Sequence, residues 1–555
     1  MTDWFEQVRD LSIRLVRWPS VTDTPGETDF GRRLYDLLAA LPYFQAHPDH
    51  LLLLPTSHDL RERFNVLAFV GGASPRTVAL AGHYDVVSVA NYGPLADAAF
   101  DPEALLPRLI EALEAGERSE ADELALRDLR GGDYLPGRGM LDMKSGIAAG
   151  LAVLMRWAEL PAPPGGLLLL ATPDEEVASH GMRSAAAQLA ELAAADRWGL
   201  ELAAAINLDA SDDRGDGSEG RAVFMGTVGK FLPCVYLVGR DTHAGSPFDG
   251  IGANLLAAEV TRRIDCNVDL IDVADGVAAP PPVSLKQIDL KRHYDVTTPG
   301  AAWCYFNVLT HGRQAGEVLG QIIGQVRDGL ADAIDYACEQ SRRFELLTGR
   351  ANGVSPWPAL VLSYEELCRR VDERSGLRSS ADWRRLLDAL AGDQELDAPE
   401  VSRRIVEALW AASGLAGPAA VVAFGSLHYP ASLVGERTPG QARLRAIVAA
   451  QAAAVGAELG MPVSVRPFFP GISDMSFLGG AVSPGDEAIL AANTPAWGSR
   501  IRVDYGVARA LDLPTINIGP WGRDYHQRTE RVNMPYSFGV VPELIWRIAG
   551  ELCAG

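Results

Sequence analysis

The stretch Gly137-Arg-Gly-Met-Leu-Asp142-Met-Lys-Ser-Gly146 holds a carboxylate, Asp142, in a turn bracketed by glycines. The turn comes directly before the apolar residues 147–157, which are predicted to form a helix. A carboxylate held in a tight turn at the head of a helix is well placed to bridge two metal ions. If Asp142 does so, other segments must supply separated His, Asp and Glu ligands, and we expect these at the ends of strands.

Short apolar runs on both sides of this turn predict buried strands at 65–70, 77–81, 166–172 and 203–208. Helices are predicted over 4–18, 28–41, 147–157 and 184–195. This alternation predicts an α/β domain with a mainly parallel sheet flanked by helices on both faces. Ligands of such sheets bind at the carboxyl ends of strands. That is where the sequence places His83, Glu175, Glu176 and Asp209.

The pattern changes after about residue 225. Strands at 231–238, 283–290, 302–309 and 421–427, with helices at 253–264 and 314–343, predict a small α+β domain with an open sheet. The α/β pattern then resumes. We therefore predict one catalytic domain made of 1–225 and 430–555, interrupted by an inserted domain at 226–429. Two charge-rich helical insertions are predicted, at 91–133 and at 344–416.

Composition limits the function classes. The 555 residues exceed one ordinary domain, and 48% hydrophobic with 22% charged residues is typical of soluble globular proteins. A net charge of −22 argues against a nucleic-acid or anionic-membrane partner. The first residues lack a signal peptide pattern, and no apolar run approaches the ~20 residues of a membrane span. Six scattered cysteines without a C-x-x-C pair favour free thiols, so a cytoplasmic location is expected.

The residue types indicate a site for two divalent metal ions. Two ions about 3.5–4 Å apart need a shared carboxylate and two or three more ligands each. Asp142 is the natural bridge. His83 and Asp209 could complete one ion. Glu176 and His526, which follows the predicted strand 514–518, could complete the other.

Two more carboxylates would act beside these ligands. Asp85 lies two residues beyond His83 on the same side of the strand, so it can accept the other ring N–H and fix the tautomer. Glu175 is left over beside Glu176 and can accept a proton from water and pass it to a leaving amine. Metal ions lower the pKa of bound water to roughly 7, which makes hydroxide available. Each motif alone is usually structural, and only their concurrence indicates a site.

The order of these motifs, together with His243-x-x-Ser-Pro, resembles the di-zinc amidohydrolases and metallopeptidases. That family includes aminoacylase, acetylornithine deacetylase, succinyl-diaminopimelate desuccinylase and glutamate carboxypeptidase. The resemblance covers nearly the whole chain and implies two zinc ions, with cobalt or manganese as alternatives. It also implies Glu175 as the general acid/base, the inserted domain as a lid or dimerisation domain, and a homodimer. His243 would stabilise the oxyanion of the tetrahedral intermediate, in cis or in trans.

Within the family, the opening Val16-Arg-Trp-Pro-Ser-Val and the stretch Phe468-Phe-Pro-Gly-Ile-Ser-Asp474 look like the arginine-utilisation (RocB-like) subgroup. Asp474 matches a glycine-rich turn near the site and is a candidate for substrate binding. The lid arginine that many members use to bind a substrate carboxylate has no clear match. Arg313 is the candidate by its position after a predicted strand.

The first functional hypothesis is a metal-dependent hydrolase that cleaves an amide or peptide C–N bond in a small N-acyl amino acid or short peptide. Metal-bound hydroxide would attack, with Glu175 as general acid/base. One alternative is a hydrolase of another C–N bond, carbamoyl or amidine, in arginine-related metabolism. The other is a non-catalytic metal-binding homologue. Inactive members would be expected to lack a ligand or the base, and this chain lacks neither.

Overall fold

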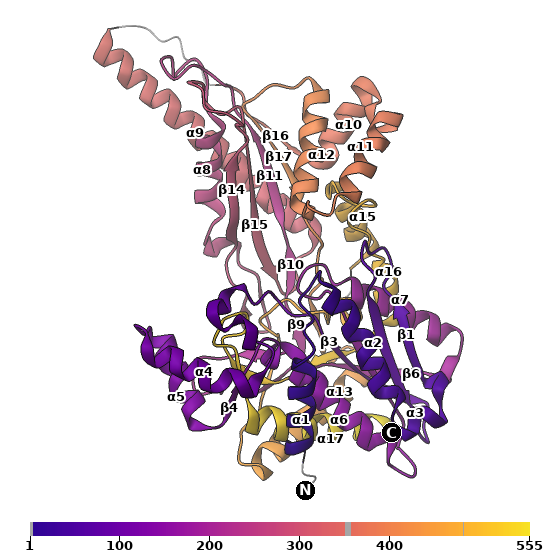
Figure 1. Cartoon of the computed structure of the whole chain (residues 1–555). Helices are drawn as coiled ribbons and strands as arrows, with labels where there is room; N and C mark the ends of the chain where they lie inside the picture. The colour runs from indigo at the N-terminus through magenta and orange to yellow at the C-terminus, as the bar shows by residue number, and fades with distance from the viewer. Residues whose placement is uncertain (1–3, 350–356, 481, 555) are drawn as a thin grey trace. The chain divides into compact units, whose positions relative to one another are not determined.

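The computed structural model describes residues 4–349, 357–480 and 482–554, and the chain forms two compact units (Figure 1). The first unit consists of Met1–Thr227, Ser432–Ala481 and Asp504–Gly555, and the second of Val228–Ala431 and Val482–Val503. The segment Val482–Val503 corrects the predicted boundary, which gave all of 430–555 to the catalytic domain. It joins the second unit because its helix α15 (Pro484–Asn493) packs against helices α9 and α10 of that unit.

The first unit is built on an eight-stranded sheet in the order β1-β2-β5-β3-β6-β20-β8-β19. Its central strands β5, β3, β6 and β20 are parallel to one another, whereas β1 and β2 at one edge are antiparallel to their neighbours. The predicted α/β class is therefore confirmed, with a mixed sheet whose centre is parallel. The strands are β1 (Leu51–Pro55), β2 (Phe64–Val70), β3 (Arg76–His83), β5 (Gly166–Thr172), β6 (Glu201–Asn207), β8 (Ala222–Phe224), β19 (Ser464–Arg466) and β20 (Thr515–Asn517).

Helices cover both faces of this sheet, as the buried strands require. All seven residues of β5 are buried, which is typical of a strand covered on both sides. Helices α1 (Phe5–Val16), α6 (Ser145–Ala158) and α17 (Val541–Cys553) pack together (Figure 1) and share a core with Val66 of β2. The preceding residue, Asn65, points its side chain to the other face and donates to Gln188 of α7 (His180–Ala194) at 2.9 Å.

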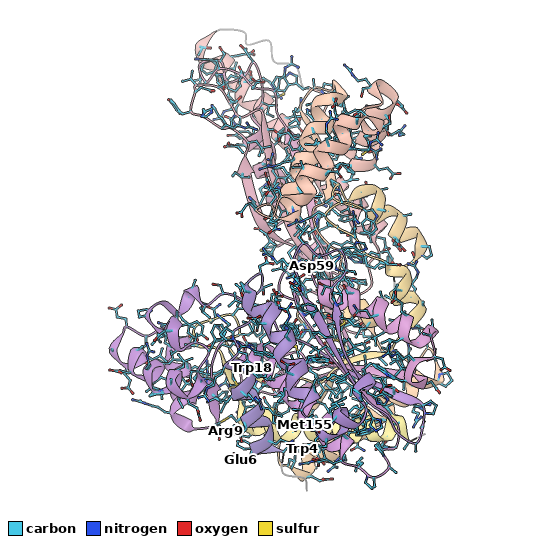
Figure 2. The ribbon with its side chains drawn as sticks, turned by 45° about the vertical axis from the view of Figure 1, so that its right-hand side comes forward. Trp4, Glu6, Arg9, Trp18, Asp59 and Met155 are labelled. Atoms are coloured by element: carbon cyan, nitrogen blue, oxygen red, sulfur yellow. The ribbon has the colours of Figure 1, made fainter. Side chains whose placement is uncertain are left out.

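The chain ends are anchored to this unit. Trp4, labelled in Figure 2, donates its indole N–H to Glu543 of α17 at 2.7 Å. The other helices of the unit are α2 (Pro25–Ala39), α3 (Pro42–Ala46), α13 (Pro439–Glu458), α14 (Ser476–Gly479) and α16 (Tyr505–Leu511). Among the described residues, no helix is both long enough and apolar enough to cross a membrane.

A second, four-stranded sheet of the first unit was not predicted. Its order is β4-β22-β21-β7, with strands β4 (Tyr134–Pro136), β22 (Arg531–Asn533), β21 (Trp521–Arg523) and β7 (Ser211–Asp212). None of these strands exceeds three residues, so no apolar alternation marks them in the sequence. The predicted insertion at 91–133 is helical, with η2 (Ala90–Ala98), α4 (Pro102–Ala115) and α5 (Glu120–Gly131), and it leads into β4.

The second unit contains a six-stranded sheet. Five of its strands follow the order β10-β15-β11-β17-β16, and the sixth, β14, also pairs with β15. Its pairs are antiparallel except β16–β17. The strands are β10 (Gly229–Phe231), β11 (Pro233–Val238), β14 (Val283–Asp289), β15 (Ala301–Thr310), β16 (Leu360–Ser363) and β17 (Ala419–Phe424). Two helices, α8 (Ala253–Ile264) and α9 (Ala315–Thr348), pack against each other.

The predicted helical insertion at 344–416 is helical only in part. It contains α10 (Tyr364–Ser375), α11 (Ala381–Gly392) and α12 (Ala398–Ser413), but it also contributes β16 to the sheet. This strand was missed because it is four residues long and directly precedes a helix. Residues 350–356 of the insertion lie outside the described part of the chain.

Candidate metal centre

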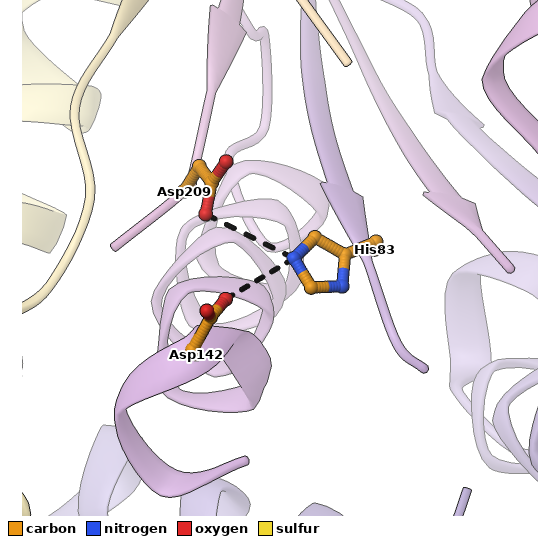
Figure 3. Close-up of side chains that lie close together, drawn as sticks. All are labelled: His83, Asp142 and Asp209. Carbon is orange, nitrogen blue, oxygen red and sulfur yellow. Dashed lines mark ion pairs between the residues drawn. The ribbon is translucent and has the colours of Figure 1, made fainter. Parts of the chain in front are cut away.

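One group of predicted metal ligands lies at the carboxyl ends of β3 and β6. His83 is the last residue of β3, and Asp209 follows β6 by two residues. The Nε2 atom of His83 lies 3.2 Å from Oδ1 of Asp142 and 3.8 Å from Oδ1 of Asp209 (Figure 3). The ligand atoms of these three side chains all lie within 4.8 Å of one another, close enough to surround one metal ion.

A second group shares Asp142. Its Oδ2 atom lies 3.2 Å from Nε2 of His526, which in turn lies 3.0 Å from Oε1 of Glu176. One oxygen of Asp142 therefore faces each histidine, as a carboxylate that bridges two ions requires. The structure brings together the same two sets of residues that the sequence pattern paired.

The backbone around Asp142 requires glycine at two positions. Gly139 has φ of +77°, and a Cβ atom there would lie 2.6 Å from Val86 Cγ1. A Cβ atom on Gly146 would lie 2.1 Å from the carbonyl oxygen of Leu208. Any other residue would therefore push the turn away from the segment that carries Asp209.

Glu530 supports this turn and was not identified from the sequence. Its Oε1 accepts from the backbone N–H groups of Leu141 (3.1 Å) and Asp142 (3.3 Å), and its Oε2 accepts from Arg138 Nη1 at 2.5 Å. Burial raises the pKa of Glu530 to about 7, although Arg138 opposes the shift. Glu530 lies in a polar loop far from the turn in sequence, so no local signal marks it.

Asp85 connects His83 to the glutamate pair. Its Oδ1 accepts from the N–H of Glu175 (3.0 Å), and its Oδ2 accepts from Thr22 Oγ1 (3.0 Å) and from the N–H of Glu176 (3.3 Å). Nδ1 of His83 lies 3.1 Å from the backbone oxygen of Asp85 and 3.5 Å from its Oδ1. The ring faces Asp85 as expected, but the backbone oxygen, rather than the predicted carboxylate, is the nearer acceptor.

Glu175 lies beside both ligand groups and belongs to neither. Its Oε2 is 4.0 Å from Nε2 of His83. Burial raises the pKa of Glu175 well above its usual range, and the charges of Asp474 and Asp209 add to the shift while His83 opposes it. A carboxyl group with a high proton affinity next to a metal centre suits proton transfer.

The candidate substrate residue Asp474 lies beside the end of β5. Its Oδ2 accepts from Oγ1 of Thr172 at 3.3 Å, and burial raises its pKa to about 7. Its Oδ1 is buried and accepts no hydrogen bond within the described ranges.

Two predicted site residues belong to the second unit. The Arg313 guanidinium donates to the backbone oxygens of Leu270 (2.6 Å) and Ile271 (2.5 Å), so it holds a local chain segment. These bonds account for Arg313 without a ligand. His243 is exposed, and its Nδ1 accepts from the N–H of Gly245 at 3.0 Å.

The charges of the cluster call for cations. Burial raises the pKa of Glu176 and of Asp209, whereas the two histidines beside Asp142 outweigh burial and lower the pKa of that carboxyl. Carboxylates buried together must be protonated or compensated by positive charge. Oδ1 of Asp142 is buried and accepts no well-directed hydrogen bond among the residues described. Imidazole nitrogens with carboxylate oxygens are a donor set that suits zinc, cobalt or manganese, so the residues present fit two such ions.

The carboxyl edge of a sheet with a parallel centre gathers the candidate ligands around a shared aspartate. A glutamate that belongs to neither ligand group lies beside them. Together these features define a metal-dependent hydrolase of the metallopeptidase class. A family model described as Peptidase family M20/M25/M40 matches residues 115–495, and the chain belongs to this family. The family expected from the motif order is thus confirmed.

Two Bacillus subtilis (strain 168) proteins are similar over nearly their whole length. The protein YqjN is 33% identical over 544 residues, 97% of this chain and 95% of YqjN. Protein RocB is 30% identical over 552 residues, 97% of this chain and 94% of RocB. The resemblance to the RocB-like subgroup is therefore matched by a full-length relative.

Solved structures of similar fold include a tripeptidase from Staphylococcus aureus subsp. aureus Mu50, with a TM-score of 0.51, 14% identity and 99% coverage of both chains. The M20 family metallo-carboxypeptidase Sso-CP2 from Sulfolobus solfataricus has a TM-score of 0.52 and 11% identity, again with 99% of both chains covered. At these identities the similarity establishes the fold alone.

Proposed function

We propose that this protein uses two divalent metal ions to hydrolyse an amide or peptide C–N bond in a small N-acyl amino acid or short peptide. The observation that carries the proposal is Asp142, which presents one oxygen to each of two histidine-containing ligand groups. His83 and Asp209 would hold one ion, and Glu176 and His526 the other. Zinc is the proposed metal, with cobalt or manganese as alternatives.

The ions would lower the pKa of water and polarise the scissile carbonyl group. Glu175 accepts a proton from the attacking water and then donates it to the amine nitrogen as the C–N bond breaks. Its position outside both ligand groups leaves its carboxylate free for this transfer. Asp85 orients His83 and, through its bonds to two backbone N–H groups, also fixes the loop that carries Glu175.

His243 is the proposed hydrogen-bond donor to the oxyanion of the tetrahedral intermediate. Because its Nδ1 accepts the N–H of Gly245, the neutral ring carries its proton on Nε2, which is the arrangement a donor needs. Complementation between a His243→Ala chain and a Glu175→Ala chain distinguishes action in trans from action in cis. Recovery of activity in mixed dimers requires a trans donor.

The second unit is proposed to act as a lid and dimerisation domain. The support for dimerisation is β14, which has no second strand neighbour among the described residues and exposes Val283, Leu285 and Ile288. Apolar side chains on a free edge strand favour pairing with another chain. A homodimer is therefore the proposed assembly. Six unpaired cysteines support a reducing, cytoplasmic location.

A second candidate function is hydrolysis of a carbamoyl or amidine C–N bond in an arginine-related compound. The full-length similarity to protein RocB favours this candidate. Asp474, whose buried Oδ1 accepts no hydrogen bond from the described residues, is the proposed substrate contact of either reaction. Arg313 remains a weaker proposal because its guanidinium is engaged by backbone oxygens.

A hydrolysis screen tests the proposal. The purified full-length protein, loaded with zinc, cobalt or manganese, is incubated with N-acyl amino acids, dipeptides and arginine-related amides, ureas and amidines, with Glu175→Ala as the control. Hydrolysis that the substitution abolishes, with two metal ions per chain by elemental analysis, is expected. A protein that binds no metal and hydrolyses nothing would support the non-catalytic alternative.

A further inference from the structure

The loop that carries His526 is the most exposed part of the candidate metal centre. The His526 side chain is 39% exposed, whereas that of His83 is 3% exposed. His526 lies between β21 and β22 and has φ of +63°, in the left-handed region that residues other than glycine rarely adopt. Such a conformation persists only when the surrounding structure holds it in place.

The hairpin that presents His526 contains an unfavourable pair of charges. Arg523 of β21 and Arg531 of β22 are directly opposite each other in the antiparallel register, and both side chains are buried. Like charges directly across a strand pair are destabilising. The hairpin therefore needs a compensating anion at this place.

The anion comes from the insertion at 91–133. Oδ2 of Asp128, in α5, accepts from Arg523 Nη1 (2.6 Å) and from Nη2 (2.7 Å) and Nε (2.9 Å) of Arg531. The single carboxylate of Asp128, whose side chain is 9% exposed, thus joins both strands of the hairpin. Asp524, next to Arg523, accepts from Nη1 of Arg531 at 2.7 Å and completes the pairing of that guanidinium.

The start of the insertion also contacts the loop. Nδ2 of Asn91 donates to the backbone oxygen of His526 at 2.8 Å. Nη2 of Arg138 donates to the same oxygen at 3.3 Å and to Oδ1 of Asn91 at 3.0 Å. Both ends of the insertion therefore hold the segment around His526. Asn91 binds its backbone, and Asp128 binds the two strands that flank it.

We infer that the insertion at 91–133 positions His526 for metal binding, with Asp128 as the principal positioning residue. The inference depends on the proposed two-metal centre. Loss of the Asp128 charge leaves two buried guanidinium groups opposed across the hairpin, so His526 moves relative to Asp142 and Glu176. The ion held by His526 then binds more weakly, by the roughly 10- to 100-fold usual for loss of a group that orients a ligand. The ion held by His83 and Asp209 keeps its affinity.

The test is a zinc titration of the full-length apoprotein against a chromophoric chelator, which measures both affinities without using activity. Asp128→Asn is compared with His526→Ala and His83→Ala, which identify the two binding steps. Asp128→Asn is expected to weaken the same step as His526→Ala and to leave the other step unchanged. The inference would be overturned if Asp128→Asn kept both zinc affinities of the wild type, or if it weakened both steps equally.

A matched control lies on the same helix. Oδ1 of Asp122 accepts from Arg528 Nη2 at 2.8 Å, but the Arg528 side chain is 46% exposed and Arg528 is outside the paired residues of β21 and β22. Asp122→Asn is therefore expected to keep both zinc affinities. If Asp128→Asn does not fold, Asn91→Ala takes its place, since it removes the bond to the backbone oxygen of His526 together with the bond from Arg138 and leaves the arginine pair of the hairpin intact. It is expected to weaken the His526 step selectively, and unchanged affinities would contradict the inference. A wild-type protein that binds fewer than two ions would instead contradict the proposed metal centre.

Discussion

The two units of this protein place their polar groups differently. In the first unit, parallel strands end at one common edge, and the end of β3 and the segments after β5 and β6 bring His83, Glu175 and Asp209 to the same place. In the second unit, the mostly antiparallel strands end at opposite edges, and the described sheet residues gather no comparable charge. Its unusual feature is instead an edge strand, β14, with exposed apolar side chains. Parallel strands bring the polar groups at their carboxyl ends together, whereas the open antiparallel sheet has an exposed edge strand that can pair with another chain.

The largest effect is expected when Asp142, at the centre of the charged cluster of the first unit, is removed. Asp142→Ala deletes the one carboxylate shared by both ligand groups, so both metal ions are expected to be lost and hydrolysis to fall to background. Elemental analysis and activity assays check this. Retention of two ions by the Asp142→Ala protein would show that Asp142 is not the bridge.

The variant Glu175→Ala, at the same edge of the first unit's sheet, distinguishes loss of catalysis from loss of metal binding. Because Glu175 belongs to neither ligand group, the variant is expected to keep two metal ions and to lose about 10²- to 10⁴-fold in kcat, the range for general acid/base catalysis. Steady-state kinetics with metal analysis measure both quantities. A kcat within a factor of a few of wild type would remove Glu175 from the reaction.

A smaller effect is expected from His428, which follows β17 in the second unit. Its Nδ1 lies 3.0 Å from the backbone oxygen of Lys230, its ring stacks on Phe231, and burial lowers its pKa to about 4. Between pH 6.5 and 4 the unfolded chain binds a proton here that the folded unit does not. The free energy of unfolding therefore falls as pH falls through this window, by at most about 3 kcal/mol.

Urea unfolding at pH 7 and pH 4.5 measures the contribution. His428→Gln is expected to reduce the loss of stability between the two pH values, since it cannot take up the proton. An identical pH dependence in both proteins would assign the acid sensitivity to other groups, such as the carboxylates of the first unit.

The smallest effect is expected at the edge strand β14 of the second unit. Ile288→Lys places a charge on the free edge of β14 and is expected to weaken homodimerisation by at least about tenfold, or about 1.4 kcal/mol. Light scattering over a range of concentrations measures it. Val268→Lys, at an exposed apolar position outside β14, is the matched control. Equal weakening by both variants, or none by Ile288→Lys, would remove β14 from the interface.

The sequence predicted what long apolar runs determine. The central strands of the first unit are continuous buried runs. His83 ends one of them, and Glu175, Glu176 and Asp209 lie within four residues of the end of another. The Gly137–Gly146 turn was identifiable because its glycines have no side-chain alternative. The order of the ligands along the chain then matched one family.

The parts that were missed depend on contacts between segments far apart in sequence. Glu530 and Asp128 are ordinary charged residues until the fold brings arginines to them. The strands of the four-stranded sheet are too short to show a period, and Val482–Val503 joins the second unit only through packing of α15. Arg313 stays a prediction: its position after a strand suggested a substrate contact, and in the structure its guanidinium donates to backbone oxygens.

The four-stranded sheet has a consequence for biosynthesis. The candidate ligands of the first ion, His83, Asp142 and Asp209, are translated within the first 209 residues, whereas β21, β22, His526 and Glu530 lie after residue 520. Until that segment leaves the ribosome, the turn at Asp142 lacks the carboxylate that binds its backbone from 388 residues away. Closing so long a loop is entropically costly and slow. Under the proposed function, metal loading is therefore expected late in the maturation of this chain, and truncated or stalled nascent products are expected to hold an incomplete centre that releases its metal.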